Sequence, residues 1–365
     1  MAAAPLNVSA IDVGYLGFRG AGAAFAVSRG AAAESTVLVE AGPAVCLGTL
    51  EAGLREANIA PQAIAHVLAT HVHLDHAGAA GHFAARGAHV WVHPRGARHL
   101  VDPERLVAGT RAVHGARFES EYGMPLPIAA SQVHAVEDGE RVHGAFDAQA
   151  VATPGHARHH HVWVLRDARH AHVFTGDVAG ILLPPGRAAG AGNVAGASGA
   201  AGASGAADSG GATGSSGVPR FLAVPMPPSD MDVVAWRDSI SRLEALVDAE
   251  ERSGRTVILW LTHGCAAADA RAHLRELRDR LEEEHALCAS ICEDGLVPGG
   301  VPCDAAVERY SQWLWPRADA AGVSPTDRAV FLGAAFMRMN LAGVAQELDR
   351  AQCGACNCSP PIIRA

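Results

Sequence analysis

The sequence predicts a mixed α/β (α+β) fold, and three observations lead to this prediction. Hydrophobic residues make up 49% of the 365 residues and charged residues only 18%, which is enough apolar surface for a large core. Short apolar runs typical of strands are interspersed with longer segments of helical periodicity. The two kinds of segment do not alternate as a strict βαβ repeat, so a mixed sheet arrangement is expected.

The N-terminal part predicts an antiparallel sheet followed by alternating helices and strands. Residues 24–27 and 36–39 are strand-like runs separated by glycine-rich turns. Residues 44–57 are amphipathic, with Val45, Leu47, Leu50 and Leu54 roughly on one helical face. Residues 64–69 then predict a buried strand, and a further helix is expected after His76. More strands are predicted at 89–92, near 133, and at 148–152, 162–165 and 172–174.

The second half of the chain begins with a compositionally biased segment. In residues 186–217 all but five residues are Gly, Ala or Ser, which predicts a flexible insertion because such a segment has few side chains to bury. A helix capped by Ser229 or Asp230 is expected next, followed by an apolar strand at 256–261. Residues 269–285, with dense charges and a leucine stripe, predict a surface helix.

The length favours one catalytic domain with additions rather than several equal domains. We assign residues 1–290 to the catalytic domain, including the 186–217 insertion. Residues 303–350 predict a small helical appendage, and residues 351–365 a tail containing Cys353, Cys356 and Cys358. Three thiols without a fourth ligand are weak evidence for a metal site.

Charge and composition exclude several classes of partner. A net charge of −9 opposes nucleic acid binding, and no apolar stretch of 18 residues predicts a membrane span. The first ten residues lack the features of a signal peptide, and eight cysteines scattered along the chain suit a reducing compartment. We therefore expect a cytoplasmic protein that acts on a small molecule, and a homodimer remains open.

The 20 histidines direct attention to metal binding, because histidine is the commonest metal ligand near neutral pH. Four candidate ligands are His71, His73, Asp75 and His76, where an apolar strand ends and a helix begins. Alternate residues of an extended segment point the same way, so the first three can converge while the turn brings His76 close by. One short segment can therefore contribute to two metal ions.

Three later residues lie at predicted strand ends, flanked by small turn residues: His156, Asp177 and His263. Taken alone, each is more typical of ordinary turn chemistry. Their order after the histidine cluster makes a common seven-ligand set the better interpretation.

These seven positions resemble the pattern of the metallo-β-lactamase superfamily, His-x-His-x-Asp-His followed by His, Asp and His. The resemblance spans roughly residues 10–270. It implies a four-layer αββα sandwich with the site at one edge of the paired sheets. It also implies that His71, His73 and His156 bind one metal ion, that Asp75, His76 and His263 bind the second, and that Asp177 bridges them.

The sequence around residues 40–43, 92–100 and 153–160 is similar to a lactonase-like branch related to glyoxalase II and acyl-homoserine lactonases. Glu40 departs from the superfamily, in which many members carry Asp at this supporting position. Val178, Ala179 and Gly180 follow Asp177 without the tyrosine found in acyl-homoserine lactonases, which disfavours that substrate.

The ligand set predicts hydrolysis. Imidazole and carboxylate ligands suit two divalent ions, zinc first, with iron or manganese also compatible. A hydroxide bridging two such ions can attack an activated carbonyl at neutral pH, as in a lactone, thioester or ester. Asp75 is the predicted catalytic residue, because its second oxygen can move the proton of the nucleophile.

The alternative that the sequence leaves open is a sulfur dioxygenase of the same fold, which uses one iron ion with ligands of the His71, His73 and His156 type and Asp177. A β-lactamase is disfavoured because that branch lacks an aspartate at position 177, and a nuclease because the chain is acidic. A non-catalytic binding protein is disfavoured by the complete ligand set. We expect His159 and His160 to be ordinary turn or surface residues, and Trp91 and Trp163 to belong to the core.

Overall fold

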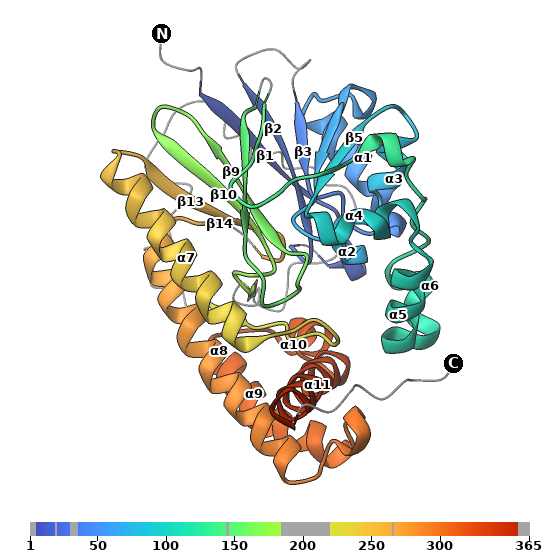
Figure 1. The fold of residues 1–365 in the computed structure, drawn as a ribbon, viewed down its shortest axis with the longest axis vertical. Coiled ribbons are helices and arrows are strands. Elements are labelled where there is room, and N and C mark those ends of the chain that lie inside the picture. The colour runs from blue at the N-terminus through green and yellow to red at the C-terminus, as the bar shows by residue number, and fades with distance from the viewer. Residues whose placement is uncertain are drawn as a thin grey trace.

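Two six-stranded sheets lie face to face in this computed structural model, with helices on both outer sides (Figure 1). The structure describes residues 5–18, 20–29, 36–143, 146–183, 220–264 and 266–356. The predicted insertion at 186–217 and the side chains of Cys353, Cys356 and Cys358 lie outside the described residues. The two sheets and the helices that flank them confirm the predicted mixed fold.

The first sheet contains the N-terminal strands in their order along the chain. An antiparallel pair, β1 and β2, is joined to β3, and from β3 to β6 the strands run parallel. Parallel neighbours need crossover connections, and short helices supply most of them. The strands are β1 (Leu6–Asp12), β2 (Ala23–Arg29), β3 (Val37–Val39), β4 (His66–Leu68), β5 (His89–Val92) and β6 (Val133–Ala135). The helices are α1 (Leu47–Glu56), α2 (Leu74–Ala77), α3 (Ala80–Ala84), α4 (Pro94–Val101), α5 (Glu104–His114) and α6 (Phe118–Glu121).

The second sheet has the order β14-β13-β10-β9-β8-β7, and a separate two-stranded sheet pairs β11 with β12. The strands are β7 (Arg141–Val142), β8 (Ala148–Ala152), β9 (His161–Arg166), β10 (His170–Gly176), β11 (Ile181–Leu183), β12 (Phe221–Ala223), β13 (Thr256–Leu261) and β14 (Ala266–Ala267). Among the described strands of this sheet, only β10 and β13 pair in parallel, with the long helix α7 (Val233–Arg252) preceding β13. This helix covers the outer face of the sheet together with α8 (Ala270–Glu293) (Figure 1).

Three separate apolar clusters explain the four layers. Phe25 and Leu68 of the first sheet meet Trp163 and Phe174 of the second in a central cluster between the sheets. A second cluster joins the first sheet to α1, α3 and α4, and a third joins the second sheet to α7 and α8. Burial on both faces accounts for the nearly continuous apolar sequence of strands such as β10. The αββα sandwich that the resemblance implies is thus confirmed.

The two tryptophans expected in the core differ in burial. Trp163 is fully buried between the sheets and donates its indole N–H to the Ala69 carbonyl at 3.1 Å. Trp91 is half-buried at the edge of the same cluster. Both pack against the central cluster, so neither is free to stack on a substrate.

Several local expectations were wrong. Helix α7 is capped by Asp232, whose carboxylate accepts the Ala235 N–H at 3.0 Å, and not by Ser229 or Asp230. Val45 is 50% exposed because residues 44–46 form a separate 3-10 turn before α1, which takes this side chain off the apolar face. Helix α8 is more than a surface helix. Its apolar stripe continues past the predicted end at 285 to Cys288 and Ile291.

Helical structure after residue 303 is confirmed, although the domain limits proposed above stay predictions. Helices α9 (Asp304–Ala320), α10 (Pro325–Phe331) and α11 (Ala334–Cys356) form a unit below the sandwich in Figure 1, and α11 packs mainly against α8. By length and composition alone, residues 325–352 are apolar enough to cross a membrane. In the fold, the apolar side chains Met337, Leu341 and Val344 are buried in the third cluster.

Candidate metal centre

All seven predicted ligands come from segments that follow the carboxyl ends of strands. The His71–His76 segment follows β4 in the first sheet, and His156, Asp177 and His263 follow β8, β10 and β13 in the second. Helix α2, which carries Asp75 and His76, lies at the lower edge of the sandwich in Figure 1. Loops on a rigid pair of sheets therefore bring together residues up to 192 positions apart, from His71 to His263.

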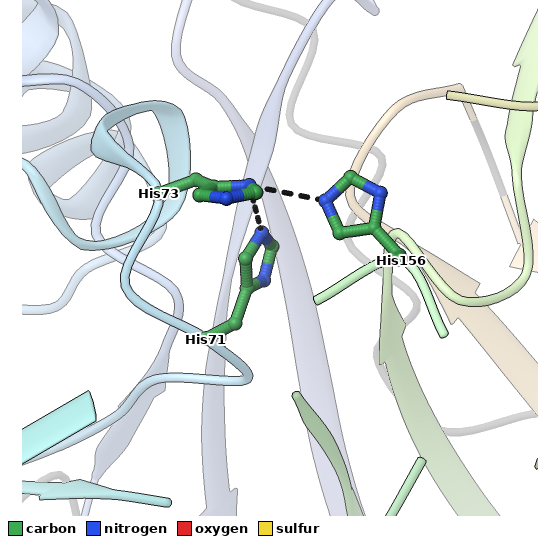
Figure 2. A group of neighbouring side chains, drawn as sticks. All are labelled: His71, His73 and His156. Carbon is green, nitrogen blue, oxygen red and sulfur yellow. Dashed lines mark hydrogen bonds between the residues drawn. The ribbon is translucent and has the colours of Figure 1, made fainter. Parts of the chain in front are cut away.

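The first group consists of His71, His73 and His156 (Figure 2). The Nδ1 atom of His73 lies 3.0 Å from Nε2 of His71 and 3.0 Å from Nε2 of His156. Ligands at about 2.0–2.1 Å from a tetrahedral ion would lie about 3.3 Å from one another. The spacing of the three nitrogens therefore fits a single metal ion.

The second group consists of Asp75, His76 and His263. The Nε2 atoms of His76 and His263 are 3.2 Å apart, and Oδ2 of Asp75 lies 3.8 Å and 3.5 Å from them, respectively. Two imidazole nitrogens and a carboxylate oxygen form a second donor set of the same size.

Asp177 lies between the two groups and faces both. Its Oδ2 atom is 3.4 Å from Nε2 of His156, whereas Oδ1 is 3.2 Å from Nε2 of His76 and 3.3 Å from Nε2 of His263. Oδ1 is buried, and these two ring nitrogens are the groups that face it among the described residues. A buried carboxylate oxygen is costly unless a proton donor or a cation lies beside it. The structure thus brings together all seven residues, and their role as ligands stays a prediction.

Hydrogen bonds to the outer nitrogens define which side of each imidazole carries a proton. The Thr70 hydroxyl donates to Oε1 of Glu40 at 2.5 Å, so its oxygen must accept from Nδ1 of His71 at 3.0 Å. Nδ1 of His76 likewise donates to Oε1 of Glu40 at 3.2 Å. In each neutral ring the proton on Nδ1 leaves the lone pair of Nε2 free.

The other two histidines are held by backbone carbonyls. Nδ1 of His156 donates to the Pro225 carbonyl at 2.9 Å, and Nδ1 of His263 donates to the Ala21 carbonyl at 2.6 Å. In their neutral forms these four rings therefore direct their Nε2 lone pairs into one small space, where a metal ion can bind them. This is the usual arrangement of histidine metal ligands, in which the second nitrogen is bonded to a protein oxygen.

Electrostatics differ between the two groups. Burial and neighbouring histidines lower the pKa of His71 and bring that of His73 to about 3, so the first group is neutral at pH 7. Burial also opposes the cationic form of His263, but the carboxylates of Asp177 and Asp75 outweigh it and raise its pKa to about 10. The same carboxylates raise the pKa of His76. Metal ions entering the second group must therefore displace protons.

The Glu40 backbone has an unusual conformation that serves the site. Its φ of 63° lies in the left-handed region, which non-glycine residues seldom adopt. Its fully buried carboxylate contacts both Thr70 and His76. The predicted supporting role of Glu40 thus agrees with its direct bond to His76 and its link to His71 through Thr70.

Gly176 is required for the close approach of the two sheets. A Cβ atom there would lie 2.4 Å from Oγ1 of Thr70 and 2.7 Å from Nε2 of His160. No larger residue fits without moving the segment that carries Asp177.

His159 and His160 were expected to be ordinary turn or surface residues; His159 does lie in a turn, but both side chains are buried beside the candidate ligands. His160 is fully buried, and its Nε2 accepts the Asp177 N–H at 3.2 Å. The His159 ring stacks on His71 at 6.0 Å, with an exposed fraction of 8%. The signal available in the sequence was that three consecutive histidines at a strand end cannot all face solvent.

A cleft of about 390 Å³ lies between α4, the β8–β9 loop and the start of α7, and none of the seven candidate ligands is among its lining residues. Pro154 and Gly155, which immediately precede His156, form part of its wall, and Arg95 and Arg158 line it. Both arginines are exposed, and no acidic side chain pairs with either guanidinium among the described residues. The chain contains no lysine, so arginine provides all its permanent side-chain cations.

A further cluster of possible ligands, Asp167, His170 and His172, lies at the other end of the second sheet. Its hydrogen bonds argue against metal binding. The Trp260 indole donates to Nδ1 of His172 at 3.1 Å, so the proton of this ring is on Nε2, the nitrogen facing Asp167. The Asp167 carboxylate accepts three backbone N–H groups, from Leu6, Arg169 and His170.

The αββα sandwich and its histidine and aspartate clusters together define a metallohydrolase fold. Residues 21–249, more than half of the chain, match the family model of the Metallo-beta-lactamase superfamily. The chain belongs to this superfamily.

Solved structures agree on the fold. A metallo-beta-lactamase family protein from Thermus thermophilus is similar, with a TM-score of 0.56 and 19% identity over 95% of this chain and 94% of that chain. An archaeal superfamily protein from Sulfolobus tokodaii has a TM-score of 0.55 and 16% identity over 93% of this chain and 98% of that chain. A comparison with curated proteins finds no match. Both structural relatives extend over the C-terminal helices as well as the sandwich.

Proposed function

We propose that this protein is a binuclear metal-dependent hydrolase of small molecules with an activated carbonyl, such as a lactone, thioester or ester. The observation that carries the proposal is the position of Asp177, whose two carboxylate oxygens face different ligand groups. A carboxylate shared in this way suits two ions better than one. Two divalent ions, zinc first among them, would acidify a water molecule and polarise the carbonyl oxygen of the substrate.

Asp75 is the residue best suited to move the proton. Its Oδ2 atom faces His76 and His263, which leaves Oδ1 for the nucleophile or the substrate. The Asp75 side chain is 20% exposed, compared with 6% for Asp177, so it can exchange protons with solvent. His71 and His76 are oriented by Glu40 and Thr70 and are fully buried, which suits binding rather than proton transfer.

The cleft beside His156 suggests which substrates fit. Two unpaired guanidinium groups at its wall would attract a carboxylate or phosphate group on the acyl or leaving portion of the substrate. We therefore propose a small anionic substrate and a cytoplasmic location, where such metabolites are abundant. A homodimer stays compatible with this proposal.

Metal content measured by elemental analysis tests the proposal directly. Protein purified without added metal or chelator should contain about two ions per chain and hydrolyse members of a lactone and thioester panel. Asp177→Asn should hold at most one ion, because the amide has a single ligand oxygen. Asp138→Asn is the matched control, since Asp138 pairs with Arg242 at 2.6 Å at an exposed site and should leave the metal content unchanged.

The same measurement distinguishes the alternative function. About one iron ion per chain, with oxygen consumption on persulfide substrates and no hydrolysis, would favour the sulfur dioxygenase. The complete second group of Asp75, His76 and His263 supports the binuclear hydrolase instead.

A further inference from the structure

We propose that Asn340, in the C-terminal helix α11, is a positioning residue for the metal ligand His156. It would act through the backbone of residues 224–226. The inference rests on the proposed metal centre and extends it, because it makes the helical appendage part of the support of the first ligand group.

Asn340 holds two backbone groups with the two ends of its amide. Its Oδ1 atom accepts the Met226 N–H at 2.8 Å, and its Nδ2 atom donates to the Val224 carbonyl at 2.9 Å. The side chain is fully buried, so water cannot replace either bond. Both peptide units that flank Pro225 are thereby fixed.

Pro225 lies between these two contacts, and its carbonyl accepts the N–H of Nδ1 of His156 at 2.9 Å. Proline has a fixed φ and no N–H of its own, so the direction of its carbonyl depends on the neighbouring peptide units. The bond to Nδ1 keeps the lone pair of Nε2 directed at Nδ1 of His73, 3.0 Å away. A continuous chain of hydrogen bonds thus connects α11 to the first ligand group.

One face of α11 holds the whole segment that leads into α7. Asn340, Gly343, Glu347 and Arg350 recur at helical spacing, and each meets residues between 224 and 233. A Cβ atom at Gly343 would lie 2.1 Å from the Met226 carbonyl oxygen. Glu347 accepts the Val233 N–H at 2.5 Å, and Arg350 donates to the Ser229 carbonyl at 2.7 Å. The close packing leaves the segment little freedom to move.

Asn340 also belongs to a buried polar network that could stabilise the fold without affecting the metal centre. Nδ2 of Asn340 also bonds to the Tyr310 hydroxyl at 2.9 Å, and that hydroxyl donates to the buried carboxylate of Glu284. These contacts join α8, α9 and α11, and they reach residues 224–226 only through a backbone hydrogen bond from Val224 to Glu284. Tyr310→Phe therefore disturbs the same buried network while leaving the bonds to Val224 and Met226 in place.

The test compares three variants of the full-length protein: Asn340→Ala, which removes both bonds, Gly343→Ala, which pushes on Met226 from the helix, and Tyr310→Phe as the control. Affinities for Zn²⁺ are measured by titration against a chelator, and ligand geometry is followed in the absorption spectrum of Co²⁺-loaded protein. Thermal unfolding of each metal-free variant reports stability separately. Because Gly343→Ala removes no hydrogen-bonding group, it keeps the test informative if Asn340→Ala does not fold.

Asn340→Ala and Gly343→Ala should each lower the affinity for one of the two ions by about tenfold, as removal of a residue that supports a metal ligand does. Both should also change the absorption spectrum of the Co²⁺-loaded protein. Tyr310→Phe should lower the melting temperature without either effect. Affinities within twofold of wild type in both test variants, or equal losses in Tyr310→Phe, would overturn the positioning role while leaving the proposed function intact. Wild-type protein that binds no metal would instead overturn the proposed function, and the inference with it.

Discussion

Glu40→Gln is the substitution that best tests how the two ligand groups are supported. The Glu40 carboxylate is fully buried and reaches one ligand of each group, His71 through the Thr70 hydroxyl and His76 directly. Glutamine keeps the size of the side chain and its carbonyl oxygen but removes the negative charge. The fold should therefore persist, while His76 loses its charged partner and Thr70, which holds His71, loses its own.

The expected magnitude follows from two short bonds, at 2.5 Å to Oγ1 of Thr70 and 3.2 Å to Nδ1 of His76. A hydrogen bond to a charged group contributes about 1 kcal/mol more than one between neutral groups. Two such bonds amount to about 2 kcal/mol, or roughly a 30-fold loss of metal affinity. The contacts of Glu40 with the Thr70 N–H and the Thr262 hydroxyl are both 3.4 Å long and add little.

Competition with a chelator, read out as the dissociation constants of both zinc ions, measures this effect. Glu250→Gln is the matched control, because Glu250 is also a buried carboxylate but pairs with Arg166 and Arg255, remote from the ligand groups. The control should lose stability without losing metal affinity. If Glu40→Gln bound both ions as tightly as wild type, Glu40 would not hold His71 and His76 in their ligand tautomers.

Three further predictions concern the second group, the contact of α8 with the appendage, and the cleft. His263→Ala should retain only about one ion by elemental analysis, because it removes one of three ligands, whereas His89→Ala, outside the groups, should retain two. Burial raises the pKa of Glu284 to about 7, above its ordinary value of 4.5. The folded state therefore binds more protons than the unfolded state between these values, and stability should fall as pH rises from about 4.5 to above 7, by at most about 3 kcal/mol. Denaturant unfolding should show that Glu284→Gln matches wild type near pH 4.5 and is more stable at pH 8.5; an unchanged difference would contradict the shift. Arg95→Ala or Arg158→Ala should raise KM for anionic substrates by about two- to fivefold, as expected for exposed charges, with kcat and the KM of neutral lactones unchanged. Equal changes for both substrate types would exclude charge recognition.

The convergence of the seven candidate ligands could be predicted from the sequence because their signal is local. Four of them occupy positions 71–76, and the other three follow apolar strands within short, recognisable turns. The strands that direct them were also predictable, because burial on both faces makes them nearly continuous apolar runs. Long strands such as β10 and β13 were therefore located within a few residues.

Helix limits and surroundings were less predictable, because they depend on contacts made far along the chain. Ser229 and Asp230 are as suitable for capping as Asp232 by residue type, but Asp232 is held by a long-range backbone hydrogen bond from its N–H to the Gly155 carbonyl. His160 resembled a turn residue until the sheets brought it to the Asp177 backbone, 17 positions away. Long-range packing thus overrides residue preference at such positions.

The supports of the ligands show this limit most clearly, since almost none of them has a sequence signature. A backbone carbonyl that accepts from a histidine can belong to any residue, as Ala21 does for His263 across 242 positions and Pro225 does for His156 across 69. Only side-chain supports such as Glu40 can be suspected from residue type. The position of Pro225 in turn depends on Asn340, 116 positions beyond Val224, to which it donates. The candidate ligands of this centre are therefore encoded in a few short segments, whereas their orientation depends on the whole folded chain, including the helices that follow the sandwich.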